Sequence, residues 1–313
     1  MTTYQLDAKR VIGTYEGQYS GPLFIVIGGI HGNENAGVRA LERLFQMIKI
    51  EPQRNPSFQF FGTLIGLKGN YVALQRQERF INEDLNRVLT TDRVNQALQA
   101  PQNEEDVEIN ELVNSVHYFI RHYNASKVVL LDLHTTTAFG GIFSITSPEP
   151  ESEKIAKGLH APVVRDILKG LDGTTIHYFN TENLGVDTTT IVFEAGQHNA
   201  PTSVDHAISA IINGMRSVGC VAPLDVEARH DNLLQRRGRK LPKLVRITYK
   251  HHIDKDDKFV MKPGYKNFQP IQKGELLAHD KNGAVYSPMD GLILMPLYQK
   301  QGSDGFFIVM KLE

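Results

Sequence analysis

The chain has 313 residues, enough for one large domain and a smaller one, and its 41% hydrophobic and 22% charged residues are typical of a folded globular protein. Lys and Arg total 34 against 35 Asp and Glu, which excludes a broad cationic surface for nucleic acid or an anionic membrane and favours small-molecule partners. Cys220 is the single cysteine, so an intrachain disulfide and a cysteine-rich zinc finger are excluded, and a reducing, cytoplasmic location is expected.

The first predicted elements are a strand, a glycine turn and a helix. The apolar run LFIVIG at residues 23–28 predicts the strand. The whole stretch Leu23–Ile30 is far shorter than the roughly 20 residues that a membrane-spanning helix needs. From Ala36 onward, apolar residues recur at the spacing of one helix face, at Val38, Leu41, Leu44, Phe45 and Ile48.

The next segments predict another strand and a polar, helix-rich region. The strand is expected at residues 58–67, and the helical region opens near Thr91 and Asp92. The acidic cluster at residues 104–108 is interpreted as solvated surface. One helix face in this region carries Leu112, Val113, Val116, Phe119 and Ile120.

Two further apolar runs, KVVLLDLH at residues 127–134 and TTTIVFEAG at residues 188–196, predict strands buried on both faces. Buried strands that alternate with helices are typical of an α/β domain with a largely parallel, twisted sheet flanked by helices. Ligands of such sheets bind at the carboxyl ends of the strands. A helix after Pro201 is expected to close this catalytic domain, residues 1–222.

Residues 223–313 are predicted to form a smaller C-terminal all-β domain. Short alternating runs such as LVRITYK are separated there by Pro-Gly, Lys-Gly, Asn-Gly and Asp-Gly turn signals. The basic run QRRGRK at residues 235–240 is interpreted as an exposed linker rather than an anion site, because the overall charge is close to neutral.

Chemically active side chains lie at three predicted strand ends. His31 and Glu34 follow the first strand, His134 ends the second and Glu194 ends the third. A catalytic zinc site needs about three protein ligands and keeps one position open. His31, Glu34 and His134 supply such a set for one Zn²⁺ ion, whereas Asp132, on the same strand face as His134, can orient its imidazole from behind.

A His-x-x-Glu pair is common by chance, so its context decides the interpretation. Here the pair stands in a Gly-Gly-x-His-Gly-x-Glu turn directly after a buried strand, and Gly28, Gly29 and Gly32 allow the backbone to bend sharply. The groups at the other two strand ends add to this pattern. Together they favour a metal site over a structural pair.

Four segments occur in the order seen in one known family: GGIHGNENAG, RFINEDLNR, LDLHTTT and FEAGQ. Over most of residues 23–200 the chain thus resembles the succinylglutamate desuccinylase and aspartoacylase family, relatives of the zinc carboxypeptidases. The resemblance implies a zinc-carboxypeptidase-like fold with a small C-terminal β-domain. It makes His31, Glu34 and His134 the zinc ligands and Glu194 the general base that activates metal-bound water.

The resemblance also implies roles for groups around the metal. Arg79 would neutralise the oxyanion of the tetrahedral intermediate, and Asn86 and Arg87 would hold a substrate carboxylate. A tyrosine of the C-terminal domain is expected near the site, and Tyr298 is chosen for it, with Tyr265 and Tyr286 as competitors. Family members are often oligomeric, so a homo-oligomer is a further expectation.

One position departs from this pattern. Aspartoacylases carry an additional Arg upstream of the catalytic Glu, and this chain has Leu184 there, so an N-acyl amino acid other than an aspartate derivative fits at least as well. His198 could be a fourth ligand or a proton shuttle, but it is interpreted as a surface histidine.

The expected function is zinc-dependent hydrolysis of the amide bond of an N-acyl amino acid or a similar small carboxylate-bearing amide. One alternative is a metallocarboxypeptidase that acts on peptides. Another is a metal-binding protein without turnover, against which the presence of Glu194 and Arg79 argues. Nucleotide binding at the glycine turn is not expected, because neither G-x-G-x-x-G nor a Walker pattern is present.

Overall fold

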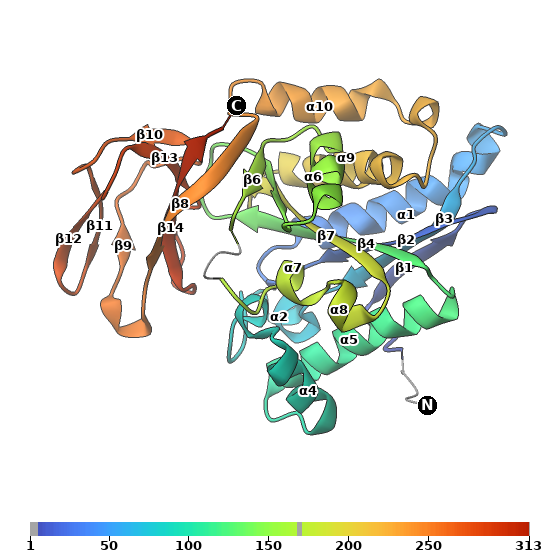
Figure 1. Cartoon of the computed structure of the whole chain (residues 1–313), viewed down its shortest axis with the longest axis horizontal. Coiled ribbons are helices and arrows are strands. Elements are labelled where there is room, and N and C mark those ends of the chain that lie inside the picture. Colours follow the sequence, from blue (N-terminus) through green and yellow to red (C-terminus); the bar gives the residue numbers. More distant parts are fainter. Residues whose placement is uncertain (1–5, 168–170, 313) are drawn as a thin grey trace.

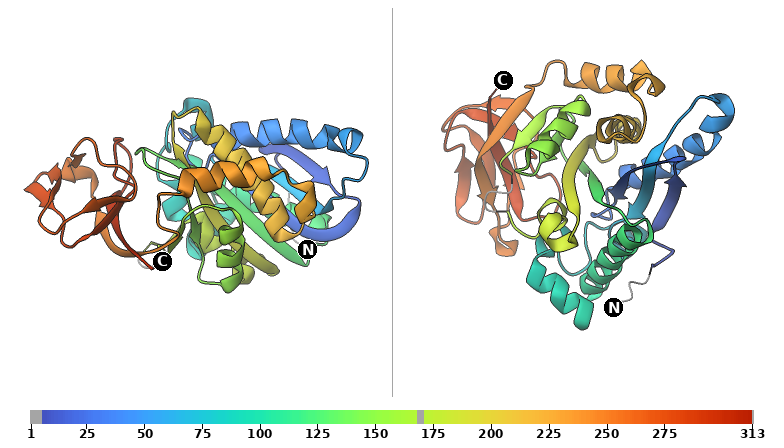
Figure 2. Two further views of the ribbon diagram at one scale, coloured as in Figure 1. Left: turned by 90° about the horizontal axis from the view of Figure 1, so that it is seen from above. Right: turned by 45° about the vertical axis from the view of Figure 1, so that its right-hand side comes forward.

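The protein is described here by a computed structural model that covers residues 6–167 and 171–312. A large α/β part is followed by a smaller part made of strands, which lies beside it (Figure 1). Seen from above, the two parts stand side by side along the long axis of the molecule (Figure 2).

Within the described residues, eleven strands form one sheet in the order β1-β3-β2-β4-β7-β5-β6-β8-β14-β13-β10. The central strands β3, β2, β4 and β7 pair in parallel, whereas β1 runs antiparallel to β3 and β5 runs antiparallel to β7. The predicted mixed, largely parallel sheet is confirmed. The strands of the α/β part are β1 (Val11–Glu16), β2 (Tyr19–Gly28), β3 (Phe61–Lys68), β4 (Lys127–Thr136), β5 (Phe143–Thr146), β6 (Val163–Arg165) and β7 (Asp187–Gln197).

Both faces of the sheet are covered by helices, which explains why its central strands are continuously apolar. Along β2, Phe24 and Val26 pack into one core, whereas Ile25 and Ile27 pack into the core on the opposite face. On the first face lie α1 (Ala36–Arg54), α6 (Pro150–Gly158), α9 (Thr202–Val218) and α10 (Ala228–Gly238). On the second face lie α2 (Tyr71–Arg76), α3 (Leu85–Val88), α4 (Thr91–Gln99), α5 (Glu104–His122), α7 (Thr175–Tyr178) and α8 (Thr181–Leu184).

The segment after residue 222 begins with helices rather than strands. A short 3-10 helix, η1 (Pro223–Asp225), leads into α10, whose Leu234 is buried in the same core as α9. The basic run at residues 235–240 is exposed, as predicted, but it forms the end of α10 and the turn after it rather than a linker alone. Its side chains are exposed because the apolar face of the helix carries the packing. The domain boundary at residue 222 stays a prediction.

Strands dominate from residue 244 onward. The first residues of β8, Leu244 to Arg246, pair in parallel with β6, and Val245 to His252 pair antiparallel with β14 on the other side. A second, three-stranded sheet in the order β12-β11-β9 completes the β part. The elements of the whole β part are β8 (Leu244–His252), η2 (Lys255–Asp257), β9 (Val260–Met261), β10 (Gln269–Ile271), β11 (Leu276–Asp280), β12 (Gly283–Tyr286), β13 (Gly291–Leu294) and β14 (Asp304–Lys311).

The helices were compared with the length and apolar character that a membrane-spanning helix needs. Within residues 6–167 and 171–312, none of them is both long enough and apolar enough to span a bilayer.

Candidate active site

The carboxyl ends of β2, β4 and β7 lie together at one edge of the sheet. The register pairs Gly28 with Leu133 and His134 with Glu194. The turn after β2 needs glycine, because Gly29 has a φ of +78° and a Cβ on Gly32 would lie 2.0 Å from the carbonyl carbon of Ala73. This turn brings His31 and Glu34 over the end of β4.

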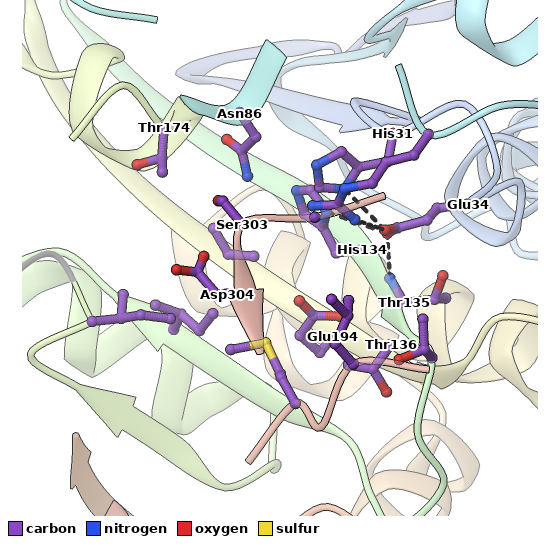
Figure 3. Close-up of a pocket in the computed structure, with 18 of the residues that line it drawn as sticks. His31, Glu34, Asn86, His134, Thr135, Thr136, Thr174, Glu194, Ser303 and Asp304 are labelled. Atoms are coloured by element: carbon purple, nitrogen blue, oxygen red, sulfur yellow. Dashed lines mark hydrogen bonds and ion pairs between the residues drawn. The ribbon is translucent and has the colours of Figure 1, made fainter. Parts of the chain in front are cut away.

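His31, Glu34 and His134 form a buried group with potential ligand atoms all within 4.8 Å of one another (Figure 3). Glu34 lies between the two imidazoles. Its Oε1 is 2.9 Å from Nδ1 of His31, and its Oε2 is 3.3 Å from Nδ1 of His134. Two imidazole nitrogens and one carboxylate oxygen are ligands that suit zinc, so this group could hold a metal ion.

The charges of this group depend on one another. Burial alone would raise the pKa of Glu34, but the adjacent His31 and His134 hold it well below its usual range. Burial would lower the pKa of His134, but Asp132 and Glu34 raise it well above the ordinary histidine value. Without a metal ion, the positive charge at this group is therefore supplied by protons.

Each histidine is also bound by a carboxylate at its other ring nitrogen. Asp132 Oδ2 lies 2.7 Å from Nε2 of His134, and Asp84 Oδ1 lies 3.1 Å from Nε2 of His31. Such contacts fix the ring and leave Nδ1 for a metal. Asp132 lies on the same face of β4 as His134 and contacts its imidazole, as the alternation of side chains along a strand predicts. Asp84 received no role from the sequence, although it stands in the segment NEDLNR at residues 82–87.

We expect Asp84→Asn to weaken zinc affinity by about 10-fold to 100-fold, the usual effect of losing a carboxylate behind a ligating histidine. The affinity can be measured by competition with a chromogenic chelator. Asp92→Asn, at an exposed position in the first turn of α4, is the control and should leave the affinity unchanged. Equal affinity of all three proteins would show that Asp84 does not support the ligand.

The loop between α2 and α3, which carries Arg79 and Asp84, is held by the acidic residues of α5. The carboxylate of Glu105 accepts hydrogen bonds from the backbone N–H groups of Ile81 and Asn82, at 2.8 and 2.9 Å. The prediction of a solvated acidic surface is wrong for three residues, because their carboxylates bind backbone amides and arginines that would otherwise be buried without partners. These residues are Glu105, Asp106 and Glu108.

Arg79 and Glu194 complete the polar wall around the candidate metal position. Nη2 and Nε of Arg79 lie 3.0 and 3.1 Å from Oδ2 of Asp84, and Nη1 lies 3.5 Å from Oε1 of Glu34. Glu194 is buried and lines the same pocket, and its Oε2 has no hydrogen-bond partner. Burial raises its pKa to about 8, and Glu34 adds to this effect. A divalent cation bound beside Glu194 would compensate the negative charges of Glu194 and Glu34.

Comparison with known proteins places this site in a family. Residues 20–215, more than half of the chain, match the model of the succinylglutamate desuccinylase/aspartoacylase catalytic domain. The chain belongs to the succinylglutamate desuccinylase/aspartoacylase family. This assignment supports a hydrolase that acts on amides.

Individual members of the family are distant relatives. The succinylglutamate desuccinylase of Pseudoalteromonas atlantica is 24% identical over 284 residues, which cover 85% of this chain and 74% of the relative. That of Pseudomonas putida GB-1 is 40% identical over 67 residues, which cover 20% of this chain and 18% of the relative.

Solved structures share the fold. The succinylglutamate desuccinylase/aspartoacylase from Rhodobacter sphaeroides matches with a TM-score of 0.63 and 16% identity, covering 96% of this chain and 88% of its own. The product-bound ectoine utilization protein EutE (DoeB) from Ruegeria pomeroyi matches with a TM-score of 0.61 and 17% identity, covering 95% and 88%.

Asn86 and Arg87, predicted from the family pattern to bind a carboxylate, both line the pocket. Oδ1 of Asn86 accepts a hydrogen bond of 2.8 Å from the backbone N–H of Thr175, so its amide nitrogen is left to donate to a ligand. Nη2 of Arg87, in contrast, is bound by Oδ2 of Asp304 at 2.6 Å. No sequence pattern indicated this partner from the β part.

The structure does not bring Tyr298 into the pocket. Its hydroxyl oxygen stays within the β part, where it accepts a hydrogen bond of 2.9 Å from the backbone N–H of Tyr265 and lies 3.0 Å from the carbonyl oxygen of Lys262. The neighbouring Gln299 lines the pocket instead, and its Oε1 accepts a hydrogen bond of 2.9 Å from Asn33. Leu184, where aspartoacylases carry an arginine, is buried in the core between the sheet and α5.

His198 lines the pocket, so its interpretation as a surface histidine is wrong. Its Nδ1 lies 2.6 Å from Oγ1 of Thr135, its Nε2 is buried, and the side chain of Gln299 lies beside the ring. Burial lowers its pKa. A neutral imidazole is therefore available beside His31, Glu34 and His134. Its position depends on the pairing of β7 with β4, which the sequence pattern alone does not predict.

We expect zinc binding near pH 7 to release protons. His134 must lose a proton to ligate, and Glu194, with a pKa of about 8, ionises beside the cation. Zinc affinity should therefore rise with pH through neutrality, by about tenfold per unit for each proton released. Calorimetry in two buffers with different ionisation enthalpies measures this number. Identical heats in both buffers would contradict the expectation.

Proposed function

We propose that the chain is a zinc-dependent hydrolase that cleaves the amide bond of an N-acyl amino acid or a similar small carboxylate-bearing amide. The observation that carries this proposal is the buried group of His31, Glu34 and His134 with Glu194 on the adjacent strand. The family assignment supports amide hydrolysis. A single zinc ion, a cytoplasmic location and a homo-oligomer remain predictions.

The side chains of the pocket can share the steps of hydrolysis. A zinc ion held here would polarise the amide carbonyl and make water acidic enough to attack near pH 7. Glu194, ionised when the cation is bound beside it, takes the proton of the attacking water and returns it to the leaving nitrogen. Arg79, held by Asp84 with Nη1 toward Glu34, lies where it can stabilise the oxyanion of the tetrahedral intermediate.

The size of the substrate is limited by the β part. Residues from the segment between β13 and β14 line the pocket, among them Leu297, Gln299 and Ser303. Gln301 of the same segment binds the backbone of Arg79 and Phe80, which ties this segment to the catalytic loop. This cover favours a small amide over the long chain of a peptide and therefore a deacylase over a carboxypeptidase.

Parallel assays of N-acyl amino acids and dipeptides, with and without a chelator, test the proposal. We expect hydrolysis of N-acyl amino acids that a chelator abolishes and added zinc restores. Faster hydrolysis of dipeptides would favour a carboxypeptidase. A fully zinc-loaded protein that hydrolyses neither class would point to metal binding without catalysis.

A further inference from the structure

The β part contributes one carboxylate to the pocket, that of Asp304 at the start of β14. Its side chain is only 6% exposed, and Oδ2 forms the 2.6 Å ion pair with Nη2 of Arg87, whose side chain is 24% exposed. Figure 3 shows Ser303 and Asp304 lining the pocket together with Asn86, Thr174 and Glu194. The β part thus places a negative charge at the position where the family pattern predicts a carboxylate-binding arginine.

The other oxygen of this carboxylate, Oδ1, is buried and has no hydrogen-bond partner. Nε of Arg87 is buried without a partner as well. Buried polar atoms are nearly always paired in folded proteins, because leaving them without water or a partner is unfavourable. An unpaired acceptor on a pocket wall is therefore suited to a donor group of a ligand.

The charges in the pocket favour a positive donor. Among the pocket-lining residues that the structure describes, the guanidinium groups are those of Arg79 and Arg87, and no lysine is present. Arg79 is bound to Asp84 and Glu34, and Arg87 is bound to Asp304. Both guanidinium groups among these residues are thus already paired with carboxylates, and neither is fully available to a second carboxylate of a dicarboxylic substrate. The apolar side chains that line this pocket include those of Ile145, Ile176, Val192, Leu297 and Phe307.

We propose that Asp304 is a specificity residue, and that its Oδ1 accepts the ammonium group of a substrate acylated on one of its two amino groups. This inference rests on the proposed amide hydrolysis. The substrate class is then the monoacylated diamino acids. Asn86 and Nε of Arg87 donate to the carboxylate of such a substrate, and Asp304 distinguishes a cationic side chain from a neutral or anionic one.

Binding of free amino acids tests this selectivity without turnover. Calorimetry compares ornithine with norvaline, its neutral counterpart of equal chain length. We expect ornithine to bind at least about tenfold more tightly to the native protein, the range of one charge-assisted hydrogen bond. Asp304→Asn should remove this difference. Equal or undetectable binding of the two amino acids to the native protein would overturn the proposal.

Two control variants separate recognition from folding. Asp304→Glu retains the charge and should retain part of the preference for ornithine. Asp290→Asn changes an exposed carboxylate of the same part of the chain, which accepts a bond from the backbone N–H of Lys273, and should change nothing. If Asp304→Asn weakens the binding of both amino acids equally, Asp304 has only a structural role and the proposal fails.

Kinetics distinguish this inference from the function on which it rests. The substrates are monoacetylated ornithine, N-acetylnorvaline and N-acetylglutamate. We expect kcat/KM of the native protein to be highest for ornithine derivatives, and Asp304→Asn to shift the preference toward N-acetylglutamate by freeing Arg87. Hydrolysis of all three without a preference refutes the role of Asp304 alone. No hydrolysis at all refutes the proposed function, while the binding data still decide on Asp304.

Discussion

Glu194→Gln is expected to retain zinc and to lower kcat by about a hundredfold or more, the typical contribution of a positioned general base. The amide has the size of the carboxyl group but cannot accept the proton of the attacking water. Oε2 of Glu194 is buried and has no hydrogen-bond partner among the described residues, so a change at this atom breaks no hydrogen bond there. Turnover on the best N-acyl amino acid and zinc content by elemental analysis are the two measurements.

The other buried glutamate of the site is the matched control. Glu34→Gln changes a residue whose two oxygens contact both histidines and the backbone N–H of Thr135, so it should lose zinc together with activity. Thermal unfolding of both variants shows whether they are folded. Native turnover of Glu194→Gln, at full zinc occupancy, would remove this residue from the mechanism.

His134→Ala should release the metal, because one imidazole and one carboxylate cannot replace three ligands. Added zinc should then no longer raise the melting temperature, since a ligand stabilises a fold only to the extent that the folded state binds it. Zinc content after dialysis and melting curves with and without zinc are the measurements.

The buried Asp132 loses its partner in this variant, so a loss of stability alone is not informative. His230→Ala controls for it, because His230 is also buried and bonded, to Ser209 on α9, but lies outside the pocket lining that the structure describes. This control should keep its zinc. Full zinc occupancy of His134→Ala would mean that the ion is bound elsewhere.

The parts of the fold that the sequence predicted are those that local hydrophobic patterns determine. Long buried strands such as β2, β4 and β7 read as continuous apolar runs, and parallel pairing then brings their carboxyl ends together. The strands β5 and β6 have only four and three residues, too short for a periodic signal. The helix α10 was missed because its apolar face is reduced to a few residues among charged ones.

The parts of the site that were missed depend on contacts between distant segments. Asp84, Glu105, His198 and Asp304 look like ordinary polar residues of loops or surfaces until the fold places them. The same limit applies to the choice of Tyr298, because the sequence does not indicate which residues of the segment between β13 and β14 reach the pocket. Ligand types were predictable from chemistry, but the partners behind them were not.

The strand β8 has a mechanical consequence for the whole enzyme. It starts beside β6 in the α/β part and continues beside β14, so both parts share one backbone ladder rather than a flexible tether. Swinging the β part outward would break that ladder at its junction. We therefore expect entry and exit of small molecules to depend on rearrangements of loops at the rim, while Asp304 keeps its distance from β4 and β7.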